Sequence, residues 1–347
     1  MTSFLRYVTA SLLLGAALPV AAQPIKAPGL QRPARILVDT WGVPHIYAAS
    51  QDDVFFVQGF NAARDRLFQI DLWRRRGLGE LASVFGPSYV EQDRATRLFL
   101  YRGDMAAEWK AYGADAQKTS ARFVAGINAY IDHVERKPEL LPFEFRQLRY
   151  KPAKWRPEDV VRIRSHGLTR NLTQEFARAQ LVCRAGLGAD AIRAQLSPAW
   201  TTRVPEGLDP CLPDEALDVF TRATDNVRFS QEAVQLARAT PNDETLEGSN
   251  NWVIAPSRTS TGRPILANDP HRAYGAPSLR YIVHLNAPGL NIIGAGEPAL
   301  PGVSIGHNGK VAFGLTIFSI DQEDLYVYET NPANPMQYRY QGGWETY

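Results

Sequence analysis

A polar stretch at residues 222–248 divides the chain into two parts with different patterns of apolar residues. Before it, apolar side chains recur at three- and four-residue steps over 54–85, 104–136 and 157–193, which predicts helices. After it, short apolar runs alternate with turn signals, which predicts strands at 252–255 (expected to be buried), 264–267, 280–286, 290–293, 311–315 and 325–328. Helices followed by strands indicate the α+β class. Because little in 222–248 would anchor to a core, we interpret this stretch as a linker or an excisable spacer.

The first residues have the pattern of an export signal. Arg6 precedes an apolar run at 12–18, and the small residues Val20 and Ala22 come after it, which predicts a signal peptide over 1–22. No other stretch approaches the roughly 20 apolar residues that a membrane span needs. We therefore expect a periplasmic or secreted protein that is not membrane-bound. A formal net charge of +2 without a broad basic surface argues against nucleic-acid binding.

Only two cysteines, Cys183 and Cys211, are present. In an oxidising compartment they could close a disulfide across a loop, and the alternative is two unpaired small core residues. The six histidines lack the spacing of a zinc site.

The polar stretch ends at Gly248, and Ser249 opens the strand-rich part. A serine is a poor nucleophile unless a base takes its proton. Its own α-amino group, once freed, has a reference pKa of about 7.7–8.0, close to the range in which a general base works best. Freeing that amine requires cleavage before Ser249, and Gly248 has no Cβ to obstruct an attack by the Ser249 hydroxyl. By itself, Gly-Ser is an ordinary loop dipeptide.

Several further segments match one family in the same order along the chain. They are residues 41–45 (Trp-Gly-Val-Pro-His), 65–73, 248–254 (Gly-Ser-Asn-Asn-Trp-Val-Ile), 265–271 (Ile-Leu-Ala-Asn-Asp-Pro-His), 301–309 and 312–316. Together they resemble the penicillin amidase family of N-terminal nucleophile hydrolases, of the penicillin and acyl-homoserine-lactone acylase type. The resemblance implies an αββα sandwich and an exported precursor that cuts itself.

The same resemblance implies how the precursor is divided. A helix-rich small chain would span 23–221, a spacer at 222–248 would be removed, and a catalytic chain would begin at 249. The two chains would form a heterodimer. Because the family's second oxyanion donor, an asparagine side chain, lies beyond Tyr347, we expect 249–347 to be only the start of the catalytic chain.

The resemblance also implies catalytic roles for individual residues. Cleavage would separate Gly248 from Ser249, and Ser249 would become the nucleophile of a hydrolase that acts on the carbon–nitrogen bond of linear amides. His271 would orient or tune the serine and its amine; alternatively, it is a turn residue after Pro270. The backbone N–H of Ile317 would be the first oxyanion donor.

A structural Ca²⁺ is implied as well. Asp321 and Asp324 match the family's carboxylate ligands, Glu323 would supply a carbonyl at most, and Glu175 is the candidate ligand from the first chain. Oxygen ligands from separate segments suit Ca²⁺. Without the resemblance, the acidic cluster would be interpreted as a solvated turn.

The substrate implied is a small-molecule acyl amide. Family members cleave penicillins, cephalosporins, acyl-homoserine lactones or lipopeptides, and are used in antibiotic chemistry or in quorum quenching. Arg272, Leu300, Ile305 and Leu315 are the candidate pocket residues, and the three apolar ones favour a medium or long acyl chain.

Two alternatives remain open. Residues 302–306 fit the G-x-S-x-G pattern of an esterase with Ser304 as nucleophile, but that motif needs a helix after the serine. The residues after Ser304 are instead predicted to form a turn and a strand. The other alternative is a non-catalytic secreted protein that keeps the fold without the chemistry.

Overall fold

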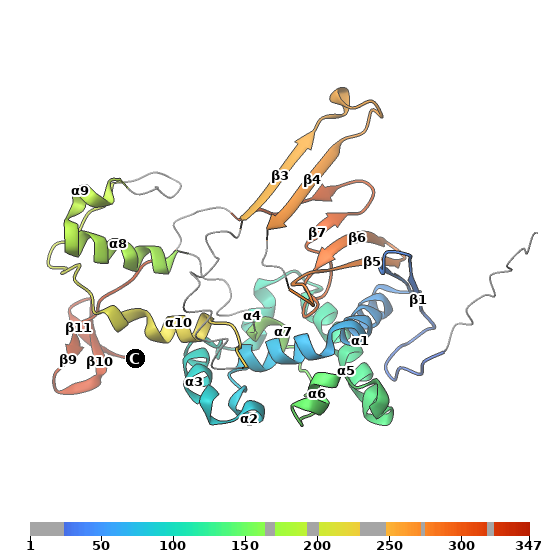
Figure 1. The fold of residues 1–347 in the computed structure, drawn as a ribbon, viewed down its shortest axis with the longest axis horizontal. Helices are drawn as coiled ribbons and strands as arrows, with labels where there is room; N and C mark the ends of the chain where they lie inside the picture. The colour runs from blue at the N-terminus through green and yellow to red at the C-terminus, as the bar shows by residue number, and fades with distance from the viewer. Residues whose placement is uncertain (1–23, 164–170, 193–200, 230–247, 272–274, 318–322) are drawn as a thin grey trace, which may run out of the picture.

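The computed structural model describes residues 24–163, 171–192, 201–229, 248–271, 275–317 and 323–347 (Figure 1). The predicted signal peptide, residues 230–247 of the predicted spacer, Arg272 and Asp321 lie outside the described residues. Among the helices that are described, none combines the length and apolar character needed to cross a bilayer.

Two long helices, α1 (Gln51–Leu78) and α5 (Ala116–Arg136), form the centre of the first part. Ser50 caps α1 by accepting a hydrogen bond from the Asp53 N–H, and the helix ends at Gly79 in the left-handed conformation, with φ 67°. The helices can approach closely because each has a glycine, Gly59 or Gly126, where it meets the other's backbone. Their facing apolar side chains supply most of the core.

The other helices are shorter. They are α2 (Ala82–Phe85), α3 (Val90–Phe99), α4 (Met105–Ala111), α6 (Phe143–Gln147), α7 (Asp159–Arg162), α8 (Leu172–Ala185), α9 (Leu187–Asp190) and α10 (Asp218–Thr224). Of these, α8, α9 and α10 lie to one side of the two long helices (Figure 1). A buried ion pair of 2.8 Å between Arg74 and Asp159 ties α7 to α1. Cys183 on α8 forms a disulfide with Cys211, so the unpaired alternative for the cysteines is wrong.

A six-stranded sheet combines strands from both sides of the junction. Its order is β1 (Arg35–Val38), β2 (Pro44–Tyr47), β5 (Tyr281–Ala287), β6 (Leu290–Gly296), β7 (Ile305–His307) and β8 (Ala312–Phe313). The strand β2, which precedes the junction, pairs in parallel with β5, which comes after it, and His45 lies opposite His284. Alternate β5 side chains from Tyr281 to Ala287 are buried in the core that α1 and α5 share. The predicted α+β class is confirmed.

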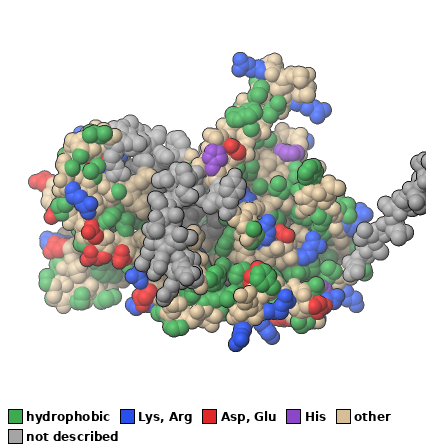
Figure 2. Space-filling view, in the orientation of Figure 1, with side chains coloured by type: hydrophobic (Ala, Val, Ile, Leu, Met, Phe, Trp, Pro, Cys, Tyr) green, Lys and Arg blue, Asp and Glu red, His purple; other side chains and the backbone are tan. Residues whose placement is uncertain are grey.

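The strands β3 (Gly248–Ile254) and β4 (Ile265–His271) form a separate two-stranded ribbon that projects from the body (Figure 1). Figure 2 shows apolar side chains along this ribbon and basic side chains at its outer end. Trp252 is 52% exposed and Val253 is 74% exposed, so the prediction that strand 252–255 is buried is wrong for the described chain. Its apolar residues have no core beside them here.

The last strands differ in part from the sequence prediction. No strand forms at 325–328; instead β9 (Thr330–Asn331), β10 (Asn334–Tyr340) and β11 (Gly343–Thr346) make a small sheet. The Tyr rings at 328 and 338 meet edge to face, with centroids 4.6 Å apart, so the 325–328 segment is held by side chains rather than by a ladder. At the end of the chain, β10 pairs with β11 as an antiparallel hairpin.

The start of the polar stretch is anchored to the helices. The Asp225 carbonyl accepts a hydrogen bond from Arg76 at 2.8 Å, and the Arg228 carbonyl accepts one from Tyr89 at 2.6 Å. The Phe229 ring lies edge to face with Phe85. The expectation that residues 222–248 have little to anchor them is therefore wrong for 222–229, because main-chain carbonyls and one aromatic ring supply the anchor.

Gln58 joins the two parts of the chain from inside α1. Its side chain donates to the Gly302 carbonyl at 2.8 Å, accepts from the Gly302 N–H at 2.8 Å, and donates to the Tyr281 hydroxyl at 3.1 Å. Gln58 is completely buried, and burial raises the pKa of Tyr281, which keeps its phenol neutral. The Gln58 amide therefore satisfies both the N–H and the carbonyl of Gly302, a residue on the other side of the junction.

We expect Gln58→Leu to lower the free energy of unfolding by roughly 2–3 kcal/mol, because it leaves buried polar groups on Gly302 and Tyr281 unsatisfied. Chemical denaturation of the full-length precursor measures the change. Gln51→Leu is the matched control: Gln51 is exposed on the same helix and makes one long bond of 3.4 Å, so its effect should stay within about 0.5 kcal/mol. Equal effects of the two variants would contradict this role of Gln58.

Candidate active site

The junction forms the first residues of β3. Gly248 pairs with His271, and Ser249 pairs with Pro270, at the end of the ribbon nearer the body. The Ser249 hydroxyl donates to the Gly248 carbonyl oxygen, with 2.5 Å between the two oxygens. The hydroxyl therefore lies against the peptide group that the sequence predicts to be cut.

The ribbon's register places His271 next to this junction. Pairing runs without interruption from Gly248 opposite His271 to Ile254 opposite Ile265, so the histidine position is fixed by the whole ladder. A Cβ added to Gly248 would lie 3.3 Å from His271 Nδ1. The alternative of a turn residue is wrong as a description of the backbone, because His271 is the last residue of β4.

The imidazole of His271 is oriented by a carboxylate. Its Nε2 lies 3.3 Å from Asp269 Oδ2, and also 3.3 Å from the side-chain nitrogen of Asn250. A carboxylate only accepts and an amide nitrogen only donates, so the contact with Asp269 needs a proton on Nε2 and the contact with Asn250 needs Nε2 unprotonated. Nε2 thus faces a donor and an acceptor at equal distance, and Nδ1 is the ring nitrogen nearer Gly248.

The segment that leads to Ile317 is bonded to the ribbon through Asn268. The Asn268 side chain accepts from the Leu315 N–H at 3.1 Å and donates to the Leu315 carbonyl at 2.9 Å. It also donates to the Asn250 carbonyl at 2.9 Å. The chain after β8 is therefore held beside the strand that carries Ser249, and Ile317 is two residues beyond Leu315.

Asn268 has no role in the sequence prediction, although it belongs to one of the matching segments. The signal that could have found it was an amide side chain directly after the apolar run Ile265-Leu266-Ala267. Such a residue in a strand needs polar partners if it is not in water.

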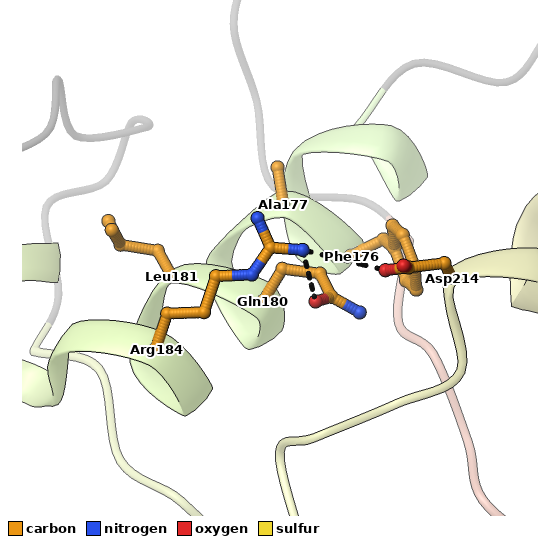
Figure 3. Close-up of a pocket in the computed structure, with 6 residues that line it drawn as sticks. All are labelled: Phe176, Ala177, Gln180, Leu181, Arg184 and Asp214. Carbon is orange, nitrogen blue, oxygen red and sulfur yellow. Dashed lines mark hydrogen bonds and ion pairs between the residues drawn. The ribbon is translucent and has the colours of Figure 1, made fainter.

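The predicted pocket residues do not share one environment. Leu300 packs against the hydrophobic core, Ile305 is half-buried on β7, and Leu315 is exposed beside the ribbon. A hollow of about 420 Å³ lies elsewhere, along one side of α8 (Figure 3), lined by Phe176, Ala177, Gln180, Leu181, Arg184 and Asp214. None of these residues belongs to the predicted substrate pocket.

The acidic segment after the gap at 318–322 lies at the N-terminus of α8. Glu323 Oε2 accepts from the backbone N–H of Asn171 at 2.7 Å and of Leu172 at 2.8 Å. The Glu323 carboxylate therefore caps the helix, a side-chain role that the sequence analysis did not foresee. Asp324 is the next residue along the chain, and Glu175 lies in the first turn of α8.

Carboxylates are the ligands that suit Ca²⁺ in chemistry, and Glu175 and Glu323 both lie at the N-terminal end of α8. Asp324 itself is exposed. Within the described ranges, no group of three or more His, Cys, Asp or Glu side chains is arranged to hold a metal ion. The calcium site therefore stays a prediction.

The esterase alternative is wrong in its geometry. Ser304 is succeeded directly by strand β7 (Ile305–His307), and its own N–H pairs with the Ala295 carbonyl at 3.0 Å. A nucleophile elbow needs a strand-to-helix turn at the serine. The G-x-S-x-G pattern here leads into β7, a strand that is paired with β6 on one side and β8 on the other.

Comparison with known proteins supports the same interpretation of the sequence. The penicillin amidase family model matches residues 33–347, so the chain belongs to the penicillin amidase family. This confirms the resemblance inferred from the motifs.

Individual relatives are similar over nearly the whole chain. Penicillin acylase 2 proenzyme from Pseudomonas sp. (strain SE83) is 33% identical, over 90% of this chain and 40% of that protein. Acyl-homoserine lactone acylase QuiP from Pseudomonas aeruginosa is 31% identical, over 93% of this chain and 37% of that protein. Penicillin G acylase from Escherichia coli is 27% identical, over 97% of this chain and 44% of that protein.

The chain thus spans about two fifths of the length of these relatives. Among solved structures, thermostable penicillin G acylase from Alcaligenes faecalis matches 50% of this chain and 97% of the solved chain, with 29% identity and a TM-score of 0.41.

Proposed function

We propose that the full-length protein is a self-processing amide hydrolase with Ser249 as its N-terminal nucleophile. The observation that carries the proposal is the 2.5 Å contact between the Ser249 hydroxyl and the Gly248 carbonyl, at the first residues of a strand. Family membership supports it, since two of the relatives are named penicillin acylases, one of them a proenzyme.

Processing would begin with attack of Ser249 Oγ on the carbonyl carbon of Gly248. A C–O bond forms, the peptide C–N bond breaks, and the hydroxyl proton passes to the departing nitrogen, which leaves an ester between Gly248 and Ser249. Water then hydrolyses the ester to give the Gly248 carboxylate and a Ser249 with both its hydroxyl and its amine. His271, whose Nδ1 lies close to Gly248, would orient the hydroxyl.

Hydrolysis of substrate would use the same oxygen. The Ser249 amine takes the hydroxyl proton, Oγ attacks the substrate's amide carbonyl, and the proton passes to the leaving amine. The Ile317 N–H would stabilise the tetrahedral oxyanion; losing such a donor typically costs about 10²–10³ in kcat. Water releases the acid from the resulting acyl-enzyme.

The cut protein would stay together as two chains. Two sets of contacts join residues before the junction to residues after it: the parallel pairing of β2 with β5, and the hydrogen bonds of Gln58 with Gly302 (the Gln58 clamp). Because residues 222–229 are bonded to the helices, we propose that an excised spacer would begin after Phe229 rather than at 222. A structural Ca²⁺ held by Glu175, Asp321 and Asp324 would add oxygen ligands from both chains, and export to the periplasm or medium completes the proposal.

The substrate class is inferred from the relatives' names. We infer an N-acyl amide, either a penicillin or an N-acyl-homoserine lactone, since proteins named as acylases of both kinds are similar to this chain. The apolar side chains of Leu300, Ile305 and Leu315 favour a medium or long acyl group, and Arg272 would either turn away from it or accommodate a polar or anionic acyl group.

Intact mass and N-terminal sequencing of the full-length protein test the proposal. We expect two chains, the larger beginning Ser-Asn-Asn-Trp, and hydrolysis of at least one member of a panel of penicillins G and V and N-acyl-homoserine lactones. An active single chain that keeps the 248–249 bond would rule out the mechanism. Two chains without turnover of any amide would favour the non-catalytic alternative.

A further inference from the structure

Asn268 uses every polar atom of its side chain on the backbone around the candidate site. Its Oδ1 accepts from the Leu315 N–H, and its Nδ2 donates to the carbonyls of Leu315 and Asn250. The amide orientation is forced, because the flipped form would set a donor against the Leu315 N–H and an acceptor against two carbonyl oxygens.

This side chain takes the place of a neighbouring strand. The ladder between β7 and β8 ends with Gly306 opposite Phe313, two residues before Leu315. Asn268 then offers Leu315 one acceptor and one donor, the two groups that a partner strand would offer to a paired residue. The backbone after Phe313 is thus held by an amide side chain at the point where the sheet stops.

Gly314, which lies between Phe313 and Leu315, leaves room for the Asn268 side chain. A Cβ on Gly314 would lie 3.1 Å from Asn268 Cγ and Oδ1, tighter than ordinary van der Waals contact. The absence of a side chain at 314 therefore lets the backbone approach the amide. The amide of Asn268 and the missing side chain of Gly314 thus both contribute to this contact.

We propose that Asn268 is a positioning residue that fixes the Ile317 N–H relative to the Ser249 hydroxyl. The inference rests on the proposed function, in which those two groups act on one carbonyl. Asn268 bonds to the residue after Ser249 and to the residue two before Ile317, so it sets the separation between nucleophile and oxyanion donor. Misplacing a catalytic group by about 1 Å can cost about 10²-fold in rate.

The test separates transition-state binding from ground-state binding. A boronic acid forms a tetrahedral anion on a serine oxygen and needs the oxyanion donor, whereas the product carboxylic acid occupies only the acyl pocket. The probes are benzylboronic acid with phenylacetic acid, and heptylboronic acid with octanoic acid. They are applied to the processed fraction of the full-length enzyme.

For Asn268→Leu we expect affinity for the boronic acid and kcat to fall together by about 10- to 100-fold. KM and the affinity for the carboxylic acid should stay within about twofold, the pattern of an interaction made only in the transition state. Asn331→Leu is the matched control, because it removes two side-chain hydrogen bonds of 2.9 Å in the separate β9–β11 sheet. It should leave both affinities unchanged.

Asn268→Asp supplies a second variant of almost the same shape. Its ionised carboxylate would repel the Leu315 and Asn250 carbonyls, whereas the protonated form can accept from the Leu315 N–H and donate to one of the two carbonyls. We expect the ratio of wild-type to variant kcat to shrink as the pH falls towards the range in which this carboxyl is protonated. Taking a ratio cancels the titration of the Ser249 amine, which both enzymes share.

The outcomes distinguish a failure of the proposed function from a failure of the positioning role of Asn268. If wild-type enzyme is neither processed nor inhibited by the boronic acids, the proposed function fails. If wild-type enzyme behaves as proposed but Asn268→Leu loses affinity for both probes equally, or for neither, the positioning role is overturned. A pH-independent ratio for Asn268→Asp would also count against it.

Discussion

Replacing Ser249 by alanine should leave the full-length protein as one uncut chain and reduce amide hydrolysis by roughly 10⁴-fold or more, the scale seen when a nucleophilic serine is removed. Both effects have the same cause. The oxygen that contacts the Gly248 carbonyl at 2.5 Å is the proposed nucleophile for the backbone and, after cleavage, for substrate. Intact mass reports the first effect, and turnover of the best substrate from the acylase panel reports the second.

Ser304→Ala is the control for this experiment. Ser304 precedes strand β7 and lacks the helix that a nucleophile elbow requires, so its variant should be processed and should retain activity. Loss of turnover in Ser304→Ala with full activity in Ser249→Ala would replace the proposed nucleophile. Cleavage of Ser249→Ala at the same bond would show that another group cuts the chain.

Cleavage after Gly248 need not separate the two parts, because their contacts are numerous and partly buried. Beyond β2 with β5 and Gln58 with Gly302, the Ser278 carbonyl accepts from Arg66 at 2.9 Å and from Gln69 at 3.1 Å. Glu323 caps α8 from the other side of the junction. Such a precursor would fold as one unit and become two chains without rearrangement of these interfaces.

Local patterns predicted the elements that depend on neighbours in sequence. Three- and four-residue spacing of apolar side chains predicted the helices that became α1 and α5, and short apolar runs between turn signals predicted the strands from β3 to β6. The motif order placed Gly248, Ser249 and His271 in one site, and the register of β3 with β4 brings them together.

Contacts between segments that are far apart along the chain could not be predicted from the sequence. Parallel pairing of β2 with β5 joins strands more than 200 residues apart, and no local signal specifies that register. Exposure of Trp252 and Val253 was missed for a related reason, since an apolar run shows that a strand can be buried but not what lies against it. The roles of Asn268 and Glu323 depend on backbone groups whose positions are set only by the fold.

The second large effect is expected at the crossing of α1 and α5. A Cβ on Gly126 would lie 1.8 Å from the Phe56 carbonyl oxygen and 2.8 Å from the Phe60 nitrogen, and a Cβ on Gly59 would lie 1.9 Å from the Phe123 carbonyl oxygen. These obstacles are backbone atoms of a buried helix, so neither can move aside without separating the helices. We expect Gly126→Ala to lower the free energy of unfolding by about 3 kcal/mol or more, at the upper end of overpacking effects.

Gly188→Ala is the matched control for that variant. Gly188 is also helical, in α9, but a Cβ there would meet nothing within 4 Å. Because alanine favours helix by up to about 1 kcal/mol over glycine, this control should be neutral or stabilising, and propensity alone would predict the same for Gly126. The two variants, compared by chemical denaturation of the full-length precursor, therefore separate close packing from propensity. If Gly126→Ala were as stable as the wild-type precursor or more stable, α1 and α5 would not meet at Gly59 and Gly126. The helices that support β5 and Gln58 would then have to cross at different residues.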